Sequence, residues 1–190
     1  VRGAARRIPV SIKITPQVTD IAAVAQALER AGVHAITASN SLPALMGVDI
    51  ETFVPYPSLG PRSTYSGLTG PAIKPITLRT IAEIARSVPL PILGTGGASD
   101  WRDAVEMMLV GAHVVQYCTA PMSHGFGIID NLKGGLPTYL ERRGLTGPQA
   151  LIGRALEHIA SHDELPRYTV RARVVPEICV GCGRCHVACR

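Results

Sequence analysis

The residues best suited to chemistry stand together at the end of the sequence. Four cysteines there follow the spacing C-x-x-C-x-x-C-x-x-x-C, namely Cys179, Cys182, Cys185 and Cys189. Thiolates with this spacing hold 4Fe–4S clusters, and where two clusters are present the fourth cysteine of the run ligates the second one. We therefore expect an electron-transfer site whose remaining ligands lie in a continuation of the chain beyond Arg190.

Two other kinds of site fit part of this cysteine loop. Zinc sites also use Cys-x-x-Cys pairs, and Cys182, Cys185 and His186 satisfy the c-type haem pattern C-x-x-C-H. Haem attachment would leave Cys179 and Cys189 without a role, and the sequence shows no export signal. The placement of all four cysteines therefore favours an iron–sulfur site over both alternatives.

Composition excludes several classes of protein. The 190 residues are 46% hydrophobic and 17% charged, which is typical of a globular α/β protein. No run approaches the ~18 apolar residues of a transmembrane helix. The basic residues behind the net charge of +5 lack interleaved aromatic residues, so we expect no nucleic-acid partner.

The clustered thiols indicate a reducing, cytoplasmic setting. The sequence starts at Val1, without Met or a signal-peptide core, which predicts a piece of a longer chain.

Apolar runs and helical patterns alternate along the first 140 residues. The runs predict buried parallel strands at residues 10–14, 34–38, 90–94 and 113–117. Apolar residues at helical spacing predict helices at residues 21–28, 78–85, 101–108 and 129–140. This order predicts a parallel α/β sheet, either doubly wound or part of a (β/α)8 TIM barrel. A complete barrel needs about 250 residues and only four units are visible, so half a barrel, with two open edges, is a reasonable architecture.

Two segments stand outside this alternation. Residues 39–76 separate the second strand from its helix, and loops of this length are usually functional lids or binding loops. A further helix is predicted over residues 148–160 by apolar residues at helical spacing: Ile152, Ala155, Leu156 and Ile159. We therefore divide the chain into a barrel portion (1–147), a helix and linker (148–175) and the beginning of a truncated 4Fe–4S ferredoxin-type domain (176–190).

Polar groups and glycines follow several predicted strands. Lys13 stands in an apolar strand and either meets an anion in the barrel mouth or faces water at an edge. Asn40 has the donor and acceptor to recognise a planar imide, although asparagine also forms turns. Gly96 and Gly97 lie between a strand and a helix, where they form either an anion site or a plain tight turn. We interpret Cys118 as a small packing residue rather than a nucleophile.

Several of these motifs occur together, in one order, in a known family. The segments are SIKITP, TASNS, STYSGLTGPAIKPITLR, GTGGASDWRDA, VQYCTA, IIDNLKGGL and the cysteine loop. Through them the chain resembles the C-terminal part of the flavin- and cluster-bearing subunit of bacterial NAD-dependent dihydropyrimidine dehydrogenases. It similarly resembles the corresponding half of the larger eukaryotic enzymes and, more distantly, the dihydroorotate dehydrogenases. The resemblance runs through nearly the whole chain, and it implies that the four units are the C-terminal half of a (β/α)8 TIM barrel.

The resemblance implies a role for individual residues. Those that match FMN contacts are Lys13, Gly70, Thr95, Gly96, Gly97, Cys118 and Thr119. Those that match contacts to the pyrimidine are Asn40 and Ser41. Those that match cluster ligands are Cys179, Cys182, Cys185 and Cys189. The acid/base of the family is a cysteine in the upstream half of the barrel, and no residue of this chain matches it, so this chain alone is expected to be catalytically incomplete.

The resemblance also implies a reaction and a partner. Family members interconvert uracil or thymine and the 5,6-dihydro forms through FMN, and iron–sulfur clusters relay electrons to FAD and NAD(P)H on a partner subunit or domain. We therefore expect a hetero-oligomer with a reductase subunit. Two alternatives stay open: a dihydroorotate dehydrogenase-type FMN enzyme, and an iron–sulfur electron-transfer module that is not an enzyme.

Overall fold

The structure is a computed structural model that describes residues 8–166 and 173–188 of the chain. It divides into two compact units, Val1–Ile159 and Ala160–Arg190. The first unit holds the sheet and five of the helices, and the second holds the cysteine loop. In the described part of the chain, no helix combines the length and the apolar character needed to cross a membrane.

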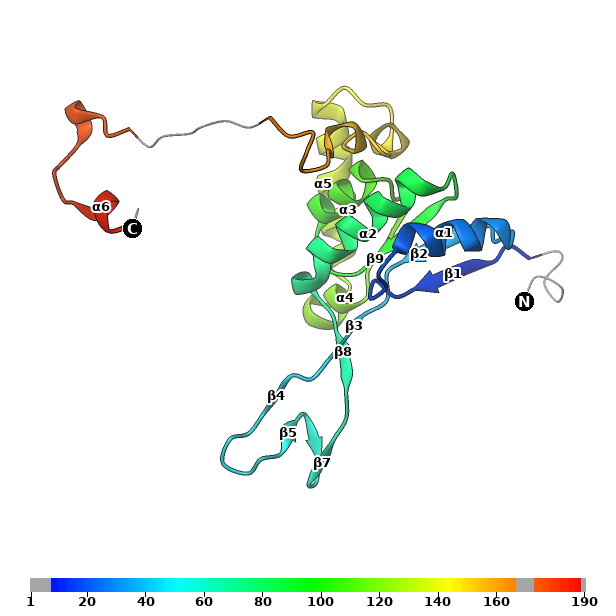
Figure 1. Cartoon of the computed structure of the whole chain (residues 1–190). Coiled ribbons are helices and arrows are strands. Elements are labelled where there is room, and N and C mark those ends of the chain that lie inside the picture. Colours follow the sequence, from blue (N-terminus) through cyan, green and yellow to red (C-terminus); the bar gives the residue numbers. More distant parts are fainter. Residues whose placement is uncertain (1–7, 167–172, 189–190) are drawn as a thin grey trace. The chain divides into compact units, whose positions relative to one another are not determined.

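The centre of the first unit is a parallel sheet (Figure 1). Its strand order is β1 (Ser11–Ile14), β2 (Ala35–Ala38), β9 (Ile92–Thr95) and β10 (Val114–Gln116). All three neighbouring pairs run parallel, so the four strands end along one edge of the sheet. The predicted parallel α/β sheet is confirmed, and each predicted strand is present with bounds shifted by one or two residues.

Four of the helices in this unit were expected. They are α1 (Ile21–Arg30), α2 (Lys74–Ser87), α3 (Trp101–Leu109) and α5 (Ile128–Arg142). The side chain of Asp20 caps α1 and that of Asp100 caps α3. Helix α2 begins before the predicted position, because the 3-10 turn η1 (Pro71–Ile73) leads directly into it. The short helix α4 (Thr119–His124) was not predicted.

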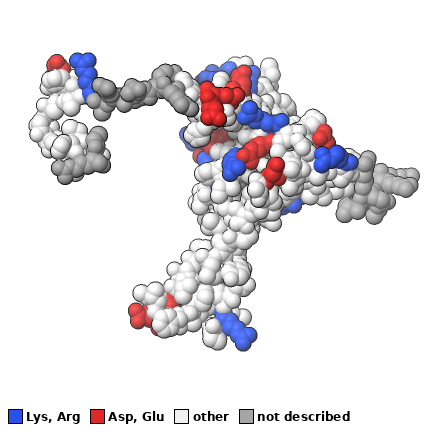
Figure 2. Space-filling view, in the orientation of Figure 1, with Lys and Arg blue, Asp and Glu red and all other residues white. Residues whose placement is uncertain are grey.

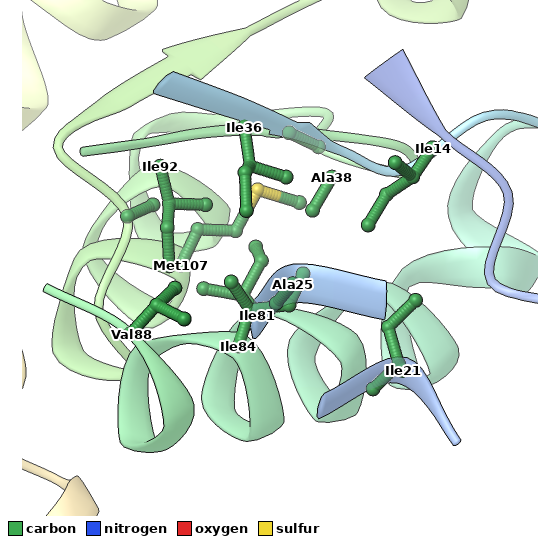
Figure 3. Packing of buried hydrophobic residues seen from close by; sticks show 12 residues of the cluster. Ile14, Ile21, Ala25, Ile36, Ala38, Ile81, Ile84, Val88, Ile92 and Met107 are labelled. Atoms are coloured by element: carbon green, nitrogen blue, oxygen red, sulfur yellow. The ribbon is translucent and has the colours of Figure 1, made fainter. Parts of the chain in front are cut away.

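Isoleucines dominate the main core, which lies between the sheet and helices α1 and α2 (Figure 3). Ile36 and Ile92 of the sheet pack with Ile81 and Ile84 of α2, and all four are at most 1% exposed. Burial of each such side chain contributes about 1.5–3 kcal/mol relative to exposure. This core fixes the sheet, and therefore the positions of its strand ends.

The segment predicted as a long loop is an arm of short paired strands (Figure 1). Strands β3 (Leu42–Ala44) and β8 (Ser66–Leu68) pair at its root. Two further antiparallel pairs form the remainder: β4 (Gly47–Val48) with β5 (Pro55–Tyr56), and β6 (Ser58–Leu59) with β7 (Arg62–Ser63). The arm leaves the end of β2 and returns to η1, so β3 begins and β8 ends beside the strand ends of the sheet.

The helix predicted over residues 148–160 is wrong. The segment forms two 3-10 turns, η2 (Pro148–Leu151) and η3 (Leu156–His158), separated by Gly153 at a φ of 75°. Its N–H groups are used elsewhere: Gly153 donates to the Met108 carbonyl (3.0 Å) and Ala155 to the Leu109 carbonyl (2.9 Å). These bonds tie the segment to carbonyls of the last turn of α3, and they outweigh the local helical pattern.

The second unit contains little regular structure in its described residues. It comprises the 3-10 turn η4 (Pro176–Ile178) and the short helix α6 (Arg184–Ala188). The described residues therefore do not form a ferredoxin domain, and the expectation that one begins at residue 176 stays a prediction.

Candidate functional site

A cavity of about 200 Å³ lies at the edge where the parallel strands end. All nine residues predicted to contact cofactor or substrate line it: Lys13, Asn40, Ser41, Gly70, Thr95, Gly96, Gly97, Cys118 and Thr119. They are spread over more than one hundred positions of sequence, yet the fold brings them together. Ser39, Thr69 and Gln116 also line the cavity and were not predicted, because serine, threonine and glutamine at strand ends have no distinctive spacing.

Parallel strand ends explain this convergence. Each strand contributes the residues at or just after its own carboxyl end, which is where ligands bind in parallel α/β sheets. Two backbone hydrogen bonds extend the sheet past the strands: Ser39 N–H donates to the Thr95 carbonyl, and Asn40 N–H donates to the Ile14 carbonyl, both at 2.8 Å. The chain between β2 and the arm is thereby held against β1 and β9.

Lys13 supplies positive charge to the cavity wall. It lies in β1 opposite Thr37 of β2 and is exposed. Within residues 8–166 and 173–188, no carboxylate forms an ion pair with it. An unpaired ammonium beside a cavity suits a ligand that carries or gains negative charge.

The glycine turn after β9 brings main chain close to the cavity. Gly96 and Gly97 have φ values of 121° and 88°, which side chains other than glycine rarely adopt. In the described residues their N–H groups have no hydrogen-bond partner. The turn leads into α3, whose first turn is closed by a capping box of Asp100 and Asp103. Free N–H groups before a helix are suited to hold a phosphate.

A buried hydroxyl beside the cavity lacks a partner. Ser39 is 3% exposed, and its Oγ accepts or donates no hydrogen bond in the described part of the protein. Such groups are rare in folded proteins and often mark a place where a ligand or ordered water belongs. Together with the glycine turn and Lys13, Ser39 gives the cavity unpartnered polar groups that fit an anionic ligand such as a phosphate ester.

The structure describes three of the four cysteines of the cysteine loop. Cys179, Cys182 and Cys185 are exposed, and Gly181 N–H donates to Cys179 Sγ at 3.4 Å. Hydrogen bonds of this kind to sulfur tune iron–sulfur clusters. Among the described residues, no three His, Cys, Asp or Glu side chains are placed to hold a metal. Cys189 lies outside the described residues, so the predicted metal site stays a prediction from spacing.

A known protein family matches the barrel portion of the chain. Residues 1–140 match the family model for dihydroorotate dehydrogenase. The chain belongs to the dihydroorotate dehydrogenase family. Membership in this family of oxidoreductases implies FMN as the cofactor and a TIM barrel as the source of the parallel sheet.

Individual relatives refine this assignment. The chain is 36% identical over 186 residues to the NAD-dependent dihydropyrimidine dehydrogenase subunit PreA of Escherichia coli (strain K12), an alignment that covers 96% of this chain and 45% of the relative. It is 39% identical over 148 residues to the catalytic subunit of dihydroorotate dehydrogenase B (NAD(+)) of Methanothermobacter thermautotrophicus, covering 78% and 48%. The same subunit of Pyrococcus abyssi is 36% identical over 149 residues, with the same coverage.

The extent of these alignments distinguishes the relatives. The chain spans just under half the length of each. An alignment over 96% of this chain must extend well into Ala160–Arg190, whereas those with the dihydroorotate dehydrogenase subunits cover 78%. The resemblance to a dihydropyrimidine dehydrogenase subunit, predicted from sequence motifs, is confirmed.

Proposed function

We propose that the complete protein interconverts uracil or thymine and the 5,6-dihydropyrimidines as the FMN-bearing subunit of a dihydropyrimidine dehydrogenase. One observation carries the proposal: the nine residues assigned to flavin and pyrimidine line a single cavity at the strand ends. The similarity to a dihydropyrimidine dehydrogenase subunit across 96% of this chain supports the choice of substrate.

Each part of the cavity has a role in this proposal. FMN, when bound, supplies hydride transfer to or from the pyrimidine ring. The N–H groups of Gly96 and Gly97, with Thr119, hold its phosphate, and Lys13 balances negative charge on the reduced ring. Asn40 and Ser41 orient the pyrimidine through hydrogen bonds to its carbonyl and N–H groups. No residue of this chain is assigned as the acid/base.

The cysteine loop is the proposed exit for electrons. Cys179, Cys182, Cys185 and Cys189 have the spacing of 4Fe–4S ligands. We assign them to clusters that relay electrons toward an FAD- and NAD(P)H-binding reductase subunit. The name of the Escherichia coli relative describes a subunit of an NAD-dependent enzyme, which is the source of this expectation of a partner.

A second candidate reaction is the oxidation of dihydroorotate. It is favoured by 36–39% identity to catalytic subunits of dihydroorotate dehydrogenase B over 78% of the chain. Steady-state assays of the complete protein with uracil, thymine and orotate distinguish the two. We expect turnover of uracil or thymine, and turnover of orotate alone would contradict the first proposal.

Cofactor content tests the proposal directly. The complete protein, purified without air, is expected to release FMN on denaturation and to contain iron and acid-labile sulfide. Iron and sulfide without FMN would instead establish an electron-transfer module without this enzyme activity. A sharp Soret band in place of broad iron–sulfur absorption would assign Cys182 and Cys185 to haem.

A further inference from the structure

A partly buried group of three charged residues, Lys74, Asp103 and Glu106, lies next to the cavity, and none of the three lines its wall. Lys74 Nζ is 2.6 Å from Asp103 Oδ1 and 2.8 Å from Glu106 Oε2. Lys74 is the first residue of α2, and the two carboxylates belong to α3. The Lys74–Asp103 pair therefore joins the first turn of α2 to the first turn of α3. Helix α2 follows the loop of Gly70, and α3 follows the turn of Gly96 and Gly97.

Asp103 reaches from this pair to the glycine turn. Its second oxygen, Oδ2, accepts hydrogen bonds from the N–H groups of Ser99 (2.6 Å) and Asp100 (3.2 Å). Burial by itself would raise the pKa of Asp103, but the Lys74 ammonium and the Ser99 amide hold it below its usual value. Asp103 is therefore a charged acceptor that fixes the main chain just after Gly97.

Lys74 contacts the same turn through its own backbone. A Cβ on Gly97 would lie 2.7 Å from Lys74 N and 2.8 Å from its Cα, so the two backbones pack directly together. On its other side, Lys74 follows η1, where Ile73 N–H donates to the carbonyl of Gly70 (3.1 Å). Lys74 thus connects the Gly70 loop and the glycine turn, both of which line the cavity.

We propose that Lys74 and Asp103 are positioning residues for phosphate binding, because they hold the turn of Gly96 and Gly97 in the conformation that exposes its N–H groups to the cavity. This inference rests on the proposed flavin function. The pair is therefore expected to strengthen binding of a flavin that carries a phosphate, and to have little effect on binding of the flavin ring alone.

Binding of FMN and of riboflavin, which lacks the phosphate, tests the inference. Dissociation constants are measured by flavin fluorescence quenching on the flavin-free complete protein. Lys74→Met is expected to weaken FMN binding about tenfold and to change riboflavin binding by less than about twofold. Lys74→Arg, which keeps the charge, is expected to restore most of the FMN affinity.

The same helix offers a matched control. Arg79 and Glu83 form an exposed ion pair at 2.9 Å on α2, away from the glycine turn. Arg79→Met likewise removes a cation and its ion pair from α2, but at an exposed site, and it is expected to leave both dissociation constants unchanged. Equal weakening of FMN and riboflavin by Lys74→Met, measured on the folded fraction, would overturn the positioning role.

Hydrogen exchange gives a readout that does not depend on flavin. In the flavin-free protein, Lys74→Met is expected to speed exchange of the Ser99 and Asp100 amides, while Arg79→Met leaves them unchanged. Unchanged exchange would also overturn the inference. If Lys74→Met does not fold, Lys74→Gln replaces it in both measurements. Failure of the wild-type protein to bind either flavin would refute the flavin proposal itself, which is a different result from a lost FMN preference.

Discussion

At the residue scale, the close approach of Gly97 to Lys74 determines what this position tolerates. Gly97→Ala places a Cβ against the backbone of Lys74 at a φ of 88°. We expect a loss of about 3 kcal/mol in the free energy of unfolding, measured by urea denaturation. Gly144→Ala is the control, since its φ is 64° with open space around it, and about 1 kcal/mol is expected there. Equal losses in the two variants would show that the close contact with Lys74 does not add to the destabilisation.

Lys13 offers a second test at this scale. Lys13→Met removes the ammonium at the cavity wall while keeping a side chain of similar length. In the complete protein we expect slower flavin reduction by dihydrouracil, by about tenfold or more, because the reduced ring loses its countercharge. Stopped-flow absorbance of the flavin measures this rate. An unchanged rate would show that Lys13 does not lie at the ring.

Sequence reasoning identified the residues of the cavity better than the residues behind it. Lys13 is a charged residue inside an apolar strand, and Asn40 and Gly96 follow strands, so their types and positions are visible in the chain itself. Asp103 and Lys74 lie 29 positions apart and resemble ordinary charged residues at helix starts. Only their contact in the folded protein shows that they act on the glycine turn.

At the element scale, the segment after α5 shows how tertiary contacts override a local pattern. Leu151 of η2 is 1% exposed and packs with Val105 of α3 and Leu140 of α5. Leu151→Ala is expected to reduce the free energy of unfolding by about 3 kcal/mol through lost burial and a new cavity. Ile159→Ala, at a residue 38% exposed, is the control and should cost about 1 kcal/mol or less. Equal costs would contradict the anchoring role of Leu151.

The arm is an element with unusual surface chemistry. Charged side chains are confined to its far part, and its other visible surface is uncharged (Figure 2). Phe53, Leu59 and Tyr65 are 81%, 90% and 81% exposed. Such concentration of exposed apolar side chains is uncommon on monomeric proteins.

We therefore expect substitutions on the arm to change surface behaviour without changing stability. Replacing Phe53 and Leu59 by serine should lower binding of a hydrophobic dye such as ANS. It should leave the free energy of unfolding within about 0.5 kcal/mol of wild type, because neither side chain is buried. A large loss of stability would indicate that these side chains pack against the protein in solution.

At the scale of the whole molecule, the Lys74–Asp103 pair predicts how stability depends on pH. The pKa of Asp103 is lowered from 3.8, so its ionised form stabilises the fold above that value, and this contribution is lost as pH falls through the lower, folded-state pKa. The difference in unfolding free energy between wild type and Asp103→Asn should therefore stay at its full size above about pH 5 and shrink progressively as the pH falls below 3.8. A difference that stays constant from pH 3 to pH 7 would contradict this assignment.

Some features of this protein follow from its local sequence patterns, and others follow only from contacts in the folded chain. The sequence by itself determined the alternation of strands and helices, and with it the edge at which Lys13, Asn40 and Gly96 meet, because parallel strands connected by helices all end on the same side. The tertiary structure decided what local patterns cannot encode. The paired arm, the turns of residues 148–159 and the Lys74–Asp103 contact each depend on hydrogen bonds or packing between segments distant in the chain.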